Sequence, residues 1–430
     1  MTTLRRQISL SSGIALAVGM VVGSGLFGLP GLALQISSPQ TAAWGWLICT
    51  LACLPLIWIF AVLGARFASA AGISRYVEAA LGQRAGYGVT AVLCGTFSLS
   101  VPALAMIGGS YALTAFGMEP GKLLVVSSVF LLIAVLFNLS GVRTTTLINK
   151  VSLLLIVATV ILLAVLRLPD LITGSRLWAT PDISTMNLGS LWKVTVLIFW
   201  AYLGWENMSF GLEEFENPDK TIKQVYFLSF VTVVILYFAL AATMNGASIH
   251  DPNVNVTQGI ANLVPLQWRQ VFSIATLIII LANANAWVFG ASRLFYSAGR
   301  NGLLPSVFGE LDSRGTPRNA LLLLATCFAI VLGASAIFHL RIEDLVLIAN
   351  QNFLILYVAS LYCFWKIETG PIRWPLTLFG LVSCAFLLAG FSYKILYPVA
   401  LLALGMLYQQ YRSKRRKPSN DGVLPETGEV

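Results

Sequence analysis

Gly23-Ser24-Gly25 interrupts an apolar stretch that runs over about residues 9–36. A second apolar stretch, over about residues 191–212, is interrupted at Gly204-Trp205-Glu206. Backbone that leaves the helix inside a membrane exposes N–H and C=O groups, and this is costly unless the protein encloses those groups in a cavity. Broken segments at corresponding places in the two halves of a membrane protein indicate the substrate site of a transporter.

The composition indicates an integral membrane protein. The 430 residues are 57% apolar and only 10% charged, whereas an ordinary soluble domain is about 25% charged. A membrane-spanning helix needs roughly 20 mainly apolar residues. The sequence predicts twelve such spans, at residues 10–36, 41–63, 86–115, 122–139, 145–167, 190–213, 224–245, 268–296, 319–338, 344–365, 374–391 and 393–411.

The twelve spans divide into two halves and a remainder. Spans 1–5 (residues 10–167) and spans 6–10 (residues 190–365) each open with a broken helix. Because five is odd, the second half enters the membrane from the opposite side, which predicts an inverted repeat. We therefore predict an all-α fold with one transmembrane domain over residues 1–411, in which helices 11 and 12 (residues 374–411) follow the repeat. Residues 412–430 are predicted to form a disordered cytoplasmic tail.

The distribution of charge predicts the orientation. With the N-terminus inside, the 27 Lys and Arg residues divide as 20 inside and 7 outside, in agreement with the positive-inside rule. We expect both termini to be cytoplasmic and the protein to lie in the cytoplasmic (inner) membrane of a bacterium. The net charge of +9 is then a topology signal and not a nucleic-acid surface. No Cys/His cluster has metal-ligand spacing, so we expect no metal and no cofactor.

The chemistry of the two breaks suits a small zwitterion. Breaking the first span creates a helix C-terminus near Val22, whose free carbonyls suit an ammonium group, and a helix N-terminus near Leu26, whose free N–H groups suit a carboxylate. Pro30 lies early in the second half-helix, where a missing N–H costs least. The break in span 6 repeats this arrangement near Tyr202 to Glu206.

The predicted substrate-binding residues belong mainly to the two breaks. They are Val22, Gly23, Ser24, Gly25, Leu26, Trp200, Ala201, Tyr202, Gly204, Trp205 and Trp287. Glu206 is the one acid placed near the middle of the membrane, and such residues are functional by default. We assign coupling or gating to Glu206 and an outer lid to Trp200. The alternatives are a protonated structural glutamate and aromatic residues that only pack.

Several other polar residues lie at membrane depth. In span 8, Asn283 and Trp287 share a helix face, whereas Asn285 points elsewhere. Span 10 contains the run Asn350 to Asn352, for which helix–helix hydrogen bonding is the alternative to a place in the cavity; Ser98 and Ser100 are weaker candidates. After span 6, an acid cluster (Glu213, Glu214, Glu216 and Asp219) would suit a membrane enzyme, but a solvated helix end explains it more simply.

Four motifs together resemble the amino acid–polyamine–organocation (APC) superfamily. They are the Gly-Ser-Gly cluster followed by Pro30, residues 69–76 after span 2, residues 199–218 of span 6, and Asn301 to Pro317 after span 8. The resemblance implies the five-plus-five inverted-repeat fold and amino acid transport by alternating access. It also implies substrate contact for Gly23 to Gly25 and Trp287, a gate at Trp200 and a proton-linked acid at Glu206. Within the superfamily, the chain most resembles bacterial exporters of methionine and branched-chain amino acids.

The sequence therefore predicts a secondary transporter of small neutral, mainly apolar amino acids, and no enzyme. A polyamine or cationic amino acid antiporter and a non-transporting amino acid sensor are the alternatives. The expected coupling ion is H⁺. Na⁺ or pure exchange stays open, because Ile156 stands where some proton-coupled members have a Lys. The expected partners are the amino acid and the lipid bilayer, with no nucleic acid, and the expected state is a monomer or homodimer.

Overall fold

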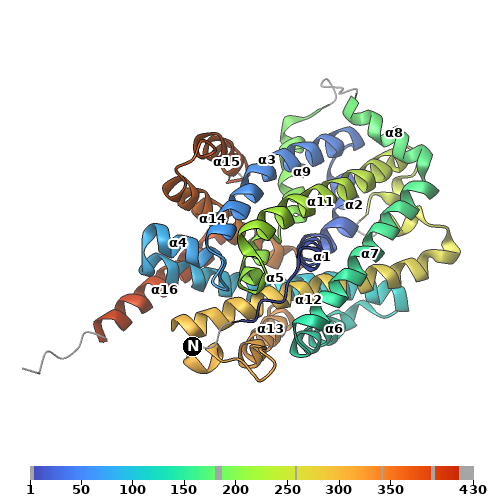
Figure 1. Ribbon diagram of the computed structural model, residues 1–430. Coiled ribbons are helices and arrows are strands. Elements are labelled where there is room, and N and C mark those ends of the chain that lie inside the picture. Colours follow the sequence, from blue (N-terminus) through green and yellow to red (C-terminus); the bar gives the residue numbers. More distant parts are fainter. Residues whose placement is uncertain (1–3, 180–185, 257–258, 341, 389–392, 416–430) are drawn as a thin grey trace, which may run out of the picture.

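The computed structural model of the protein describes residues 4–179, 186–256, 259–340, 342–388 and 393–415 (Figure 1). The described residues form helices, short 3₁₀ turns and one isolated β-bridge, between Ile8 and Phe215. The α-helices are α1 (Leu10–Val21), α2 (Ser24–Ile36), α3 (Pro39–Arg66), α4 (Ile73–Leu81), α5 (Gln83–Phe116), α6 (Leu123–Leu139), α7 (Val142–Leu166), α8 (Leu168–Ala179), α9 (Leu188–Phe199), α10 (Trp205–Met208), α11 (Pro218–Ser248), α12 (Arg269–Asn301), α13 (Arg318–Phe338), α14 (Ile342–Ile367), α15 (Arg373–Leu388) and α16 (Leu396–Arg415).

Ten helical segments of the described chain are long and apolar enough to cross a membrane. They agree with the first ten predicted spans, and α1 with α2 forms the first of them. Helix α15 is apolar but has only 16 residues, and α16 does not meet the same criterion. The count of twelve and the inverted repeat therefore stay predictions. Helix α16 continues to Arg415, so it includes the start of the predicted tail, and residues 416–430 lie outside the described chain.

Short polar signals start the helices. Ser9 accepts a hydrogen bond from the Ser12 amide at the start of α1, and Ser38 accepts one from Thr41 at the start of α3, where Pro39 is the first helical residue. These caps satisfy amide groups that have no partner inside the helix. The short helix α4 follows α3 and precedes α5.

Both halves of the first broken span lie in the interior of the bundle. Helix α1 packs against α7, α11 and α12, and α2 packs against α9 and α11. Helices α6 and α7 lie on one side of the molecule, and α15 and α16 lie on the other (Figure 1). Large apolar side chains on α7 and α13 are exposed, among them Leu154 (71%) and Ile337 (72%). A soluble monomer rarely exposes such continuous apolar faces, and hydrocarbon explains them.

Candidate functional site

The first break spans two residues. Helix α1 ends at Val21, and Val22 has extended backbone angles (φ −92°, ψ 114°) although its amide still donates to the Val18 carbonyl. Gly23 also lies outside helical geometry, and α2 begins at Ser24. The first amide groups of α2 have no carbonyl partner within the helix. Pro30 is the seventh residue of α2 and lies inside the helix, so the expectation that it lies early in this half-helix, where a missing N–H costs least, was wrong.

The second break follows a 3₁₀ turn. Helix α9 ends at Phe199, and η3 (Trp200–Tyr202) precedes an extended Leu203 (φ −81°, ψ 150°). Gly204 then takes φ = +126°, a region that side chains of L-residues rarely adopt. The chain continues as α10 and the 3₁₀ helix η4 (Ser209–Glu214). The positive φ therefore favours a glycine at the position directly before α10.

The two breaks touch each other through their backbones. A Cβ atom added at Gly204 would lie 2.7 Å from the Met20 carbonyl oxygen, and one added at Gly25 would lie 2.9 Å from the Cα atom of Ala201. At both positions the neighbouring backbone leaves no room for a Cβ atom, so only glycine fits. The two cavities that we describe lie elsewhere, one between α4, α5 and α12 and one beside Asn217. Neither of these two cavities is lined by residues of the breaks.

Side-chain donors already occupy the carbonyls at the end of α1. The amide nitrogen of Asn283 donates to the carbonyls of Gly19 (2.6 Å) and Met20 (3.0 Å), and the indole N–H of Trp287 also donates to Met20 (2.6 Å). The hydroxyl of Tyr237 lies 3.1 Å from the Val21 carbonyl oxygen. The sequence led us to expect free carbonyls here, and this expectation was wrong for the state of the protein that we describe.

Glu206 is fully buried beside the second break. One carboxylate oxygen accepts the Gly204 amide (2.9 Å), and the other accepts the Tyr357 hydroxyl (2.7 Å). Both donors are neutral, and Tyr357 comes from α14, more than 150 positions along the chain. Sequence reasoning missed Tyr357, because a tyrosine in an apolar span carries no signal of its own.

The predicted aromatic residues point in different directions. Trp200 is half-buried in η3, and the Tyr202 hydroxyl is hydrogen-bonded to Thr50 of α3. Trp205 packs against the rings of Tyr226 and Phe230 on α11, with ring centroids 5.9 and 6.2 Å apart. The environment of Trp205 is therefore a packing contact between helices.

Trp287 belongs to an aromatic cluster beside the breaks. Its ring centroid lies 5.6 Å from that of Phe97 on α5 and 5.8 Å from that of Phe353 on α14. Phe97 also packs against Phe210 of η4, at 5.5 Å. Four elements thus meet in one apolar layer, and this layer lies next to the carbonyl group that Trp287 binds.

Other polar residues join helices to one another. Asn285 points away from the breaks, as expected, and accepts a hydrogen bond from Asn138 of α6 (2.9 Å). The side chain of Asn352 donates to Thr96 of α5 (3.0 Å), and Ser98 donates to the Cys94 carbonyl of its own helix. For Asn352 the structure agrees with the helix–helix reading. Ser100 and Gln351 are buried, and Asn350 is half-buried.

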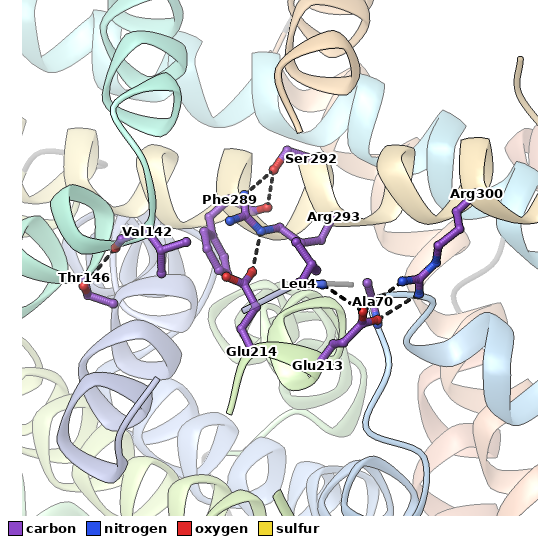
Figure 2. Close-up of polar contacts among 10 residues, drawn as sticks. All are labelled: Leu4, Ala70, Val142, Thr146, Glu213, Glu214, Phe289, Ser292, Arg293 and Arg300. Carbon is purple, nitrogen blue, oxygen red and sulfur yellow. Dashed lines mark hydrogen bonds and ion pairs between the residues drawn. The ribbon is translucent and has the colours of Figure 1, made fainter. Parts of the chain in front are cut away.

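Two ion pairs close one end of the bundle, which we call the N-terminal face: residues 4–9, α4 and the adjoining ends of η4 and α12. Figure 2 shows two glutamates from the end of η4 facing two arginines of α12. Glu214 pairs with Arg293 (2.7 Å) with both side chains 1% exposed, and Glu213 pairs with Arg300 (2.8 Å) with 16% and 17% exposed. The arginines are seven residues, about two turns, apart on one helix.

The reading of a solvated acid cluster was therefore wrong for two of its four members. Glu216 and Asp219 are exposed, whereas Glu213 and Glu214 are paired. Arg300 holds Glu213 through two parallel hydrogen bonds, to both carboxylate oxygens (2.9 and 2.8 Å). The sequence shows two adjacent glutamates but gives no indication that α12 supplies their partners.

The N-terminal segment reinforces this closure. The amides of Gln7 and Ile8 both donate to the Glu214 carbonyl (2.8 and 2.9 Å), and the Glu216 amide donates to the Ile8 carbonyl (3.2 Å). The Leu4 amide reaches the Glu213 carboxylate (3.4 Å). The start of the chain is thus hydrogen-bonded to the end of the second broken span, and the two broken spans are tied together at this face.

A family model described as amino acid permease matches residues 8–420. The chain belongs to the amino acid permease family. It is 25% identical to an uncharacterised amino acid permease, YecA, of Bacillus subtilis over 96% of this chain and 98% of that one. It is 23% identical to the L-methionine/branched-chain amino acid exporter YjeH of Escherichia coli over 98% of this chain and 99% of that one.

A more distant relative comes from a mammal. The permease is 27% identical to the large neutral amino acids transporter small subunit 2 of Oryctolagus cuniculus, over 76% of this chain and 64% of that one. The resemblance to the APC superfamily is thereby confirmed, and this family is not a family of enzymes. Its family membership and its apolar helices show that the chain is a multi-pass membrane protein of the amino acid permease type.

Proposed function

We propose that the permease is a secondary active transporter that moves small neutral, mainly apolar amino acids across the cytoplasmic membrane by alternating access. The contact between the two helix breaks carries this proposal. There, two interrupted backbones meet in the interior of the bundle, and each leaves peptide groups outside a regular helix. Two relatives are named for neutral amino acids, which supports the same substrate class.

The proposed binding mode assigns backbone amides to the carboxylate of the substrate and backbone carbonyls to its ammonium group. The carboxylate binds the first amides of α2, at Ser24, Gly25 and Leu26, because a helix N-terminus combines free N–H groups with a partial positive charge. The ammonium binds carbonyls of the breaks, at Val21 or Val22 and Ala201. The remaining contacts proposed around this place are Gly23, Trp200, Tyr202, Gly204 and Trp287, whereas Trp205 packs between helices.

The limited charge near the breaks favours a neutral substrate. Glu206 is the acid that the described structure places at the breaks, and both its oxygens already accept hydrogen bonds. A polyamine or cationic amino acid carries a further positive charge, which requires a further buried acid in compensation. We propose that Glu206 serves coupling, with H⁺ as the coupling ion, and that Trp200 closes the opposite side.

The ion pairs at the N-terminal face belong to a closed cytoplasmic side in this proposal. With both termini in the cytoplasm, Arg293 and Arg300 must separate from η4 before the site opens inward. Export would then begin with that separation.

The test is uptake and counterflow in proteoliposomes with a panel of labelled amino acids, with and without pH and Na⁺ gradients. We expect counterflow of leucine, valine or methionine. We also expect uptake of the same amino acids that a pH gradient drives and a Na⁺ gradient leaves unchanged. Preference for lysine or cadaverine would favour the antiporter instead. Saturable binding without flux of any amino acid would favour a sensor and contradict the proposal.

A further inference from the structure

The side chain of Tyr237 lies where the two helix breaks meet. It projects from α11 and is fully buried. Its hydroxyl oxygen lies 2.6 Å from the Ala201 carbonyl oxygen and 3.1 Å from that of Val21. A Cβ atom added at Gly25 would lie 3.4 Å from the same hydroxyl, so this one group adjoins the end of α1, the start of α2 and the 3₁₀ turn.

The number of hydrogens sets Tyr237 apart from the other donors at the breaks. Asn283 has two N–H bonds for its two carbonyl partners, and Trp287 has one for its single partner. A tyrosine has one O–H bond, and both partners of Tyr237 are carbonyl oxygens, which only accept. The hydroxyl can therefore fully satisfy one of the two carbonyls at a time, and the shorter distance favours Ala201.

Contacts of the ring with two aromatic neighbours place the hydroxyl at this point. The ring of Tyr237 lies between those of Trp46 on α3 and Tyr202, with centroid distances of 5.3 Å to each. An ammonium group has three N–H donors and satisfies two carbonyls at once. To bridge Val21 and Ala201, however, it must take the position between their oxygens that the hydroxyl now occupies. The hydroxyl and an ammonium group thus compete for the same acceptors.

We propose that the Tyr237 hydroxyl is a placeholder for the ammonium group of the substrate. It occupies the carbonyls of the breaks while the carrier is empty and withdraws when an amino acid binds. This inference rests on the proposed function and adds a consequence to it. The empty carrier can close around its own hydroxyl, so it returns across the membrane without a substrate, and the permease carries out net transport as well as exchange.

The test compares two transport modes in the Tyr237→Phe variant. Net efflux is measured from proteoliposomes loaded with a labelled neutral amino acid into substrate-free buffer, and exchange is measured with the same amino acid unlabelled outside. Without the hydroxyl, the empty carrier must bury a carbonyl that has no donor, so net efflux should fall about tenfold, whereas exchange should stay within about twofold of the wild type.

Thr243→Val is the matched control. Thr243 is buried on the same helix, and its hydroxyl donates only to the Ala239 carbonyl of that helix (2.9 Å). Removing this hydroxyl should leave the ratio of net efflux to exchange unchanged. A control that lowers the ratio as much as Tyr237→Phe would overturn the proposal, because any lost hydroxyl on α11 would then have the same effect.

Three further results would overturn the proposal. Equal losses of net efflux and exchange in Tyr237→Phe would make the tyrosine a structural or substrate contact, and unchanged rates would give it no role. In the wild type, net efflux more than about a hundredfold slower than exchange would mean that the empty carrier does not return, and this measurement needs no variant to fold. A wild type that shows neither mode with any amino acid would remove the proposed function itself.

Discussion

The helix breaks and the N-terminal face are both places where the two broken spans meet the rest of the bundle, but they are built from opposite chemistry. At the breaks, the contacts are hydrogen bonds from neutral donors to backbone carbonyls, from Asn283, Trp287 and Tyr237. At the N-terminal face they are ion pairs, from Arg293 and Arg300. Neutral hydrogen bonds exchange partners at little cost, whereas breaking a buried ion pair exposes two charges. The first chemistry suits a site that a solute enters, and the second suits a closure.

The buried ion pair should give the largest effect. Arg293→Ala leaves the Glu214 carboxylate buried without its partner, and breaking such a pair costs about 3–5 kcal/mol. We expect a strong loss of thermal stability in detergent. The double variant Glu214→Leu with Arg293→Met should recover most of it, because two apolar side chains leave no unpaired charge. A single variant as stable as the wild type would show that the pair is not formed.

Gly204 offers a test of the backbone contact between the breaks. Gly204→Ala combines a φ that L-residues rarely adopt with a Cβ atom 2.7 Å from the Met20 carbonyl oxygen. We therefore expect the free energy of unfolding to fall by about 2–4 kcal/mol, measured by thermal unfolding, and little transport. Gly82→Ala is the control: Gly82 also has positive φ (+88°), but nothing lies within 4 Å of its added Cβ atom. Its free energy of unfolding should fall by only about 1–2 kcal/mol, which is the cost of the backbone strain. Equal losses would mean that the breaks do not touch.

Glu206 tests whether the breaks need one charge after all. In Glu206→Gln, the amide oxygen can still accept the Gly204 N–H, whereas the NH2 group faces the Tyr357 hydroxyl, which must then accept a hydrogen bond where it now donates one. We expect the protein to fold, transport to fall about tenfold and the pH dependence of transport to disappear. Transport at various external pH values in proteoliposomes measures this. A variant with the wild-type rate and pH profile would remove Glu206 from coupling.

The two tryptophans of the second break should separate substrate contact from packing. Trp200 is half-buried, and Trp205 packs against Tyr226 and Phe230. We expect Trp200→Ala to raise the KM of transport several-fold with little change in thermal stability, and Trp205→Ala to cost about 3–5 kcal/mol of stability. Kinetics and thermal unfolding of both variants would show this, and the reverse pattern would exchange their assigned roles.

Salt should give the smallest effect and should act at the N-terminal face alone. The pair Glu213–Arg300 is partly exposed, so screening should weaken it, whereas the buried pair Glu214–Arg293 and the neutral contacts at the breaks should hardly respond. In thermal unfolding at 0.05 and 0.5 M NaCl, Arg300→Gln should differ from the wild type by about 1 kcal/mol at low salt and by less at high salt. A difference that grows with salt would contradict the screening.

Sequence reasoning located the breaks because glycine runs inside apolar stretches are visible locally. It placed the interruptions at Gly23 and at Gly204, and these two glycines directly precede the first residues of α2 and α10. It also predicted that Asn283 and Trp287 share one face, and both side chains reach the end of α1. It was wrong in expecting the carbonyls at the end of α1 to be free. The helical repeat shows which side chains share a face of one helix, but it does not show which backbone groups of another helix they contact.

The partners of the charged and polar groups could not be read from the sequence. Glu213 and Glu214 stand next to each other in the chain, yet they pair with arginines of a helix far along it. Tyr237 and Tyr357 lie in apolar spans that contain many aromatic residues, and nothing in the spacing distinguishes them. Only a contact between distant segments gives these residues their roles.

The sequence alone determined that the chain is a bundle of apolar helices, with interruptions at two glycine-containing positions, because hydrocarbon demands long apolar helices and glycine permits backbone that other residues resist. The tertiary structure decided that the two interruptions touch, that neutral donors occupy their carbonyls and that two ion pairs close one end. These are interactions across the bundle, and their strength depends on distance and burial, which the order of residues along a single helix does not specify.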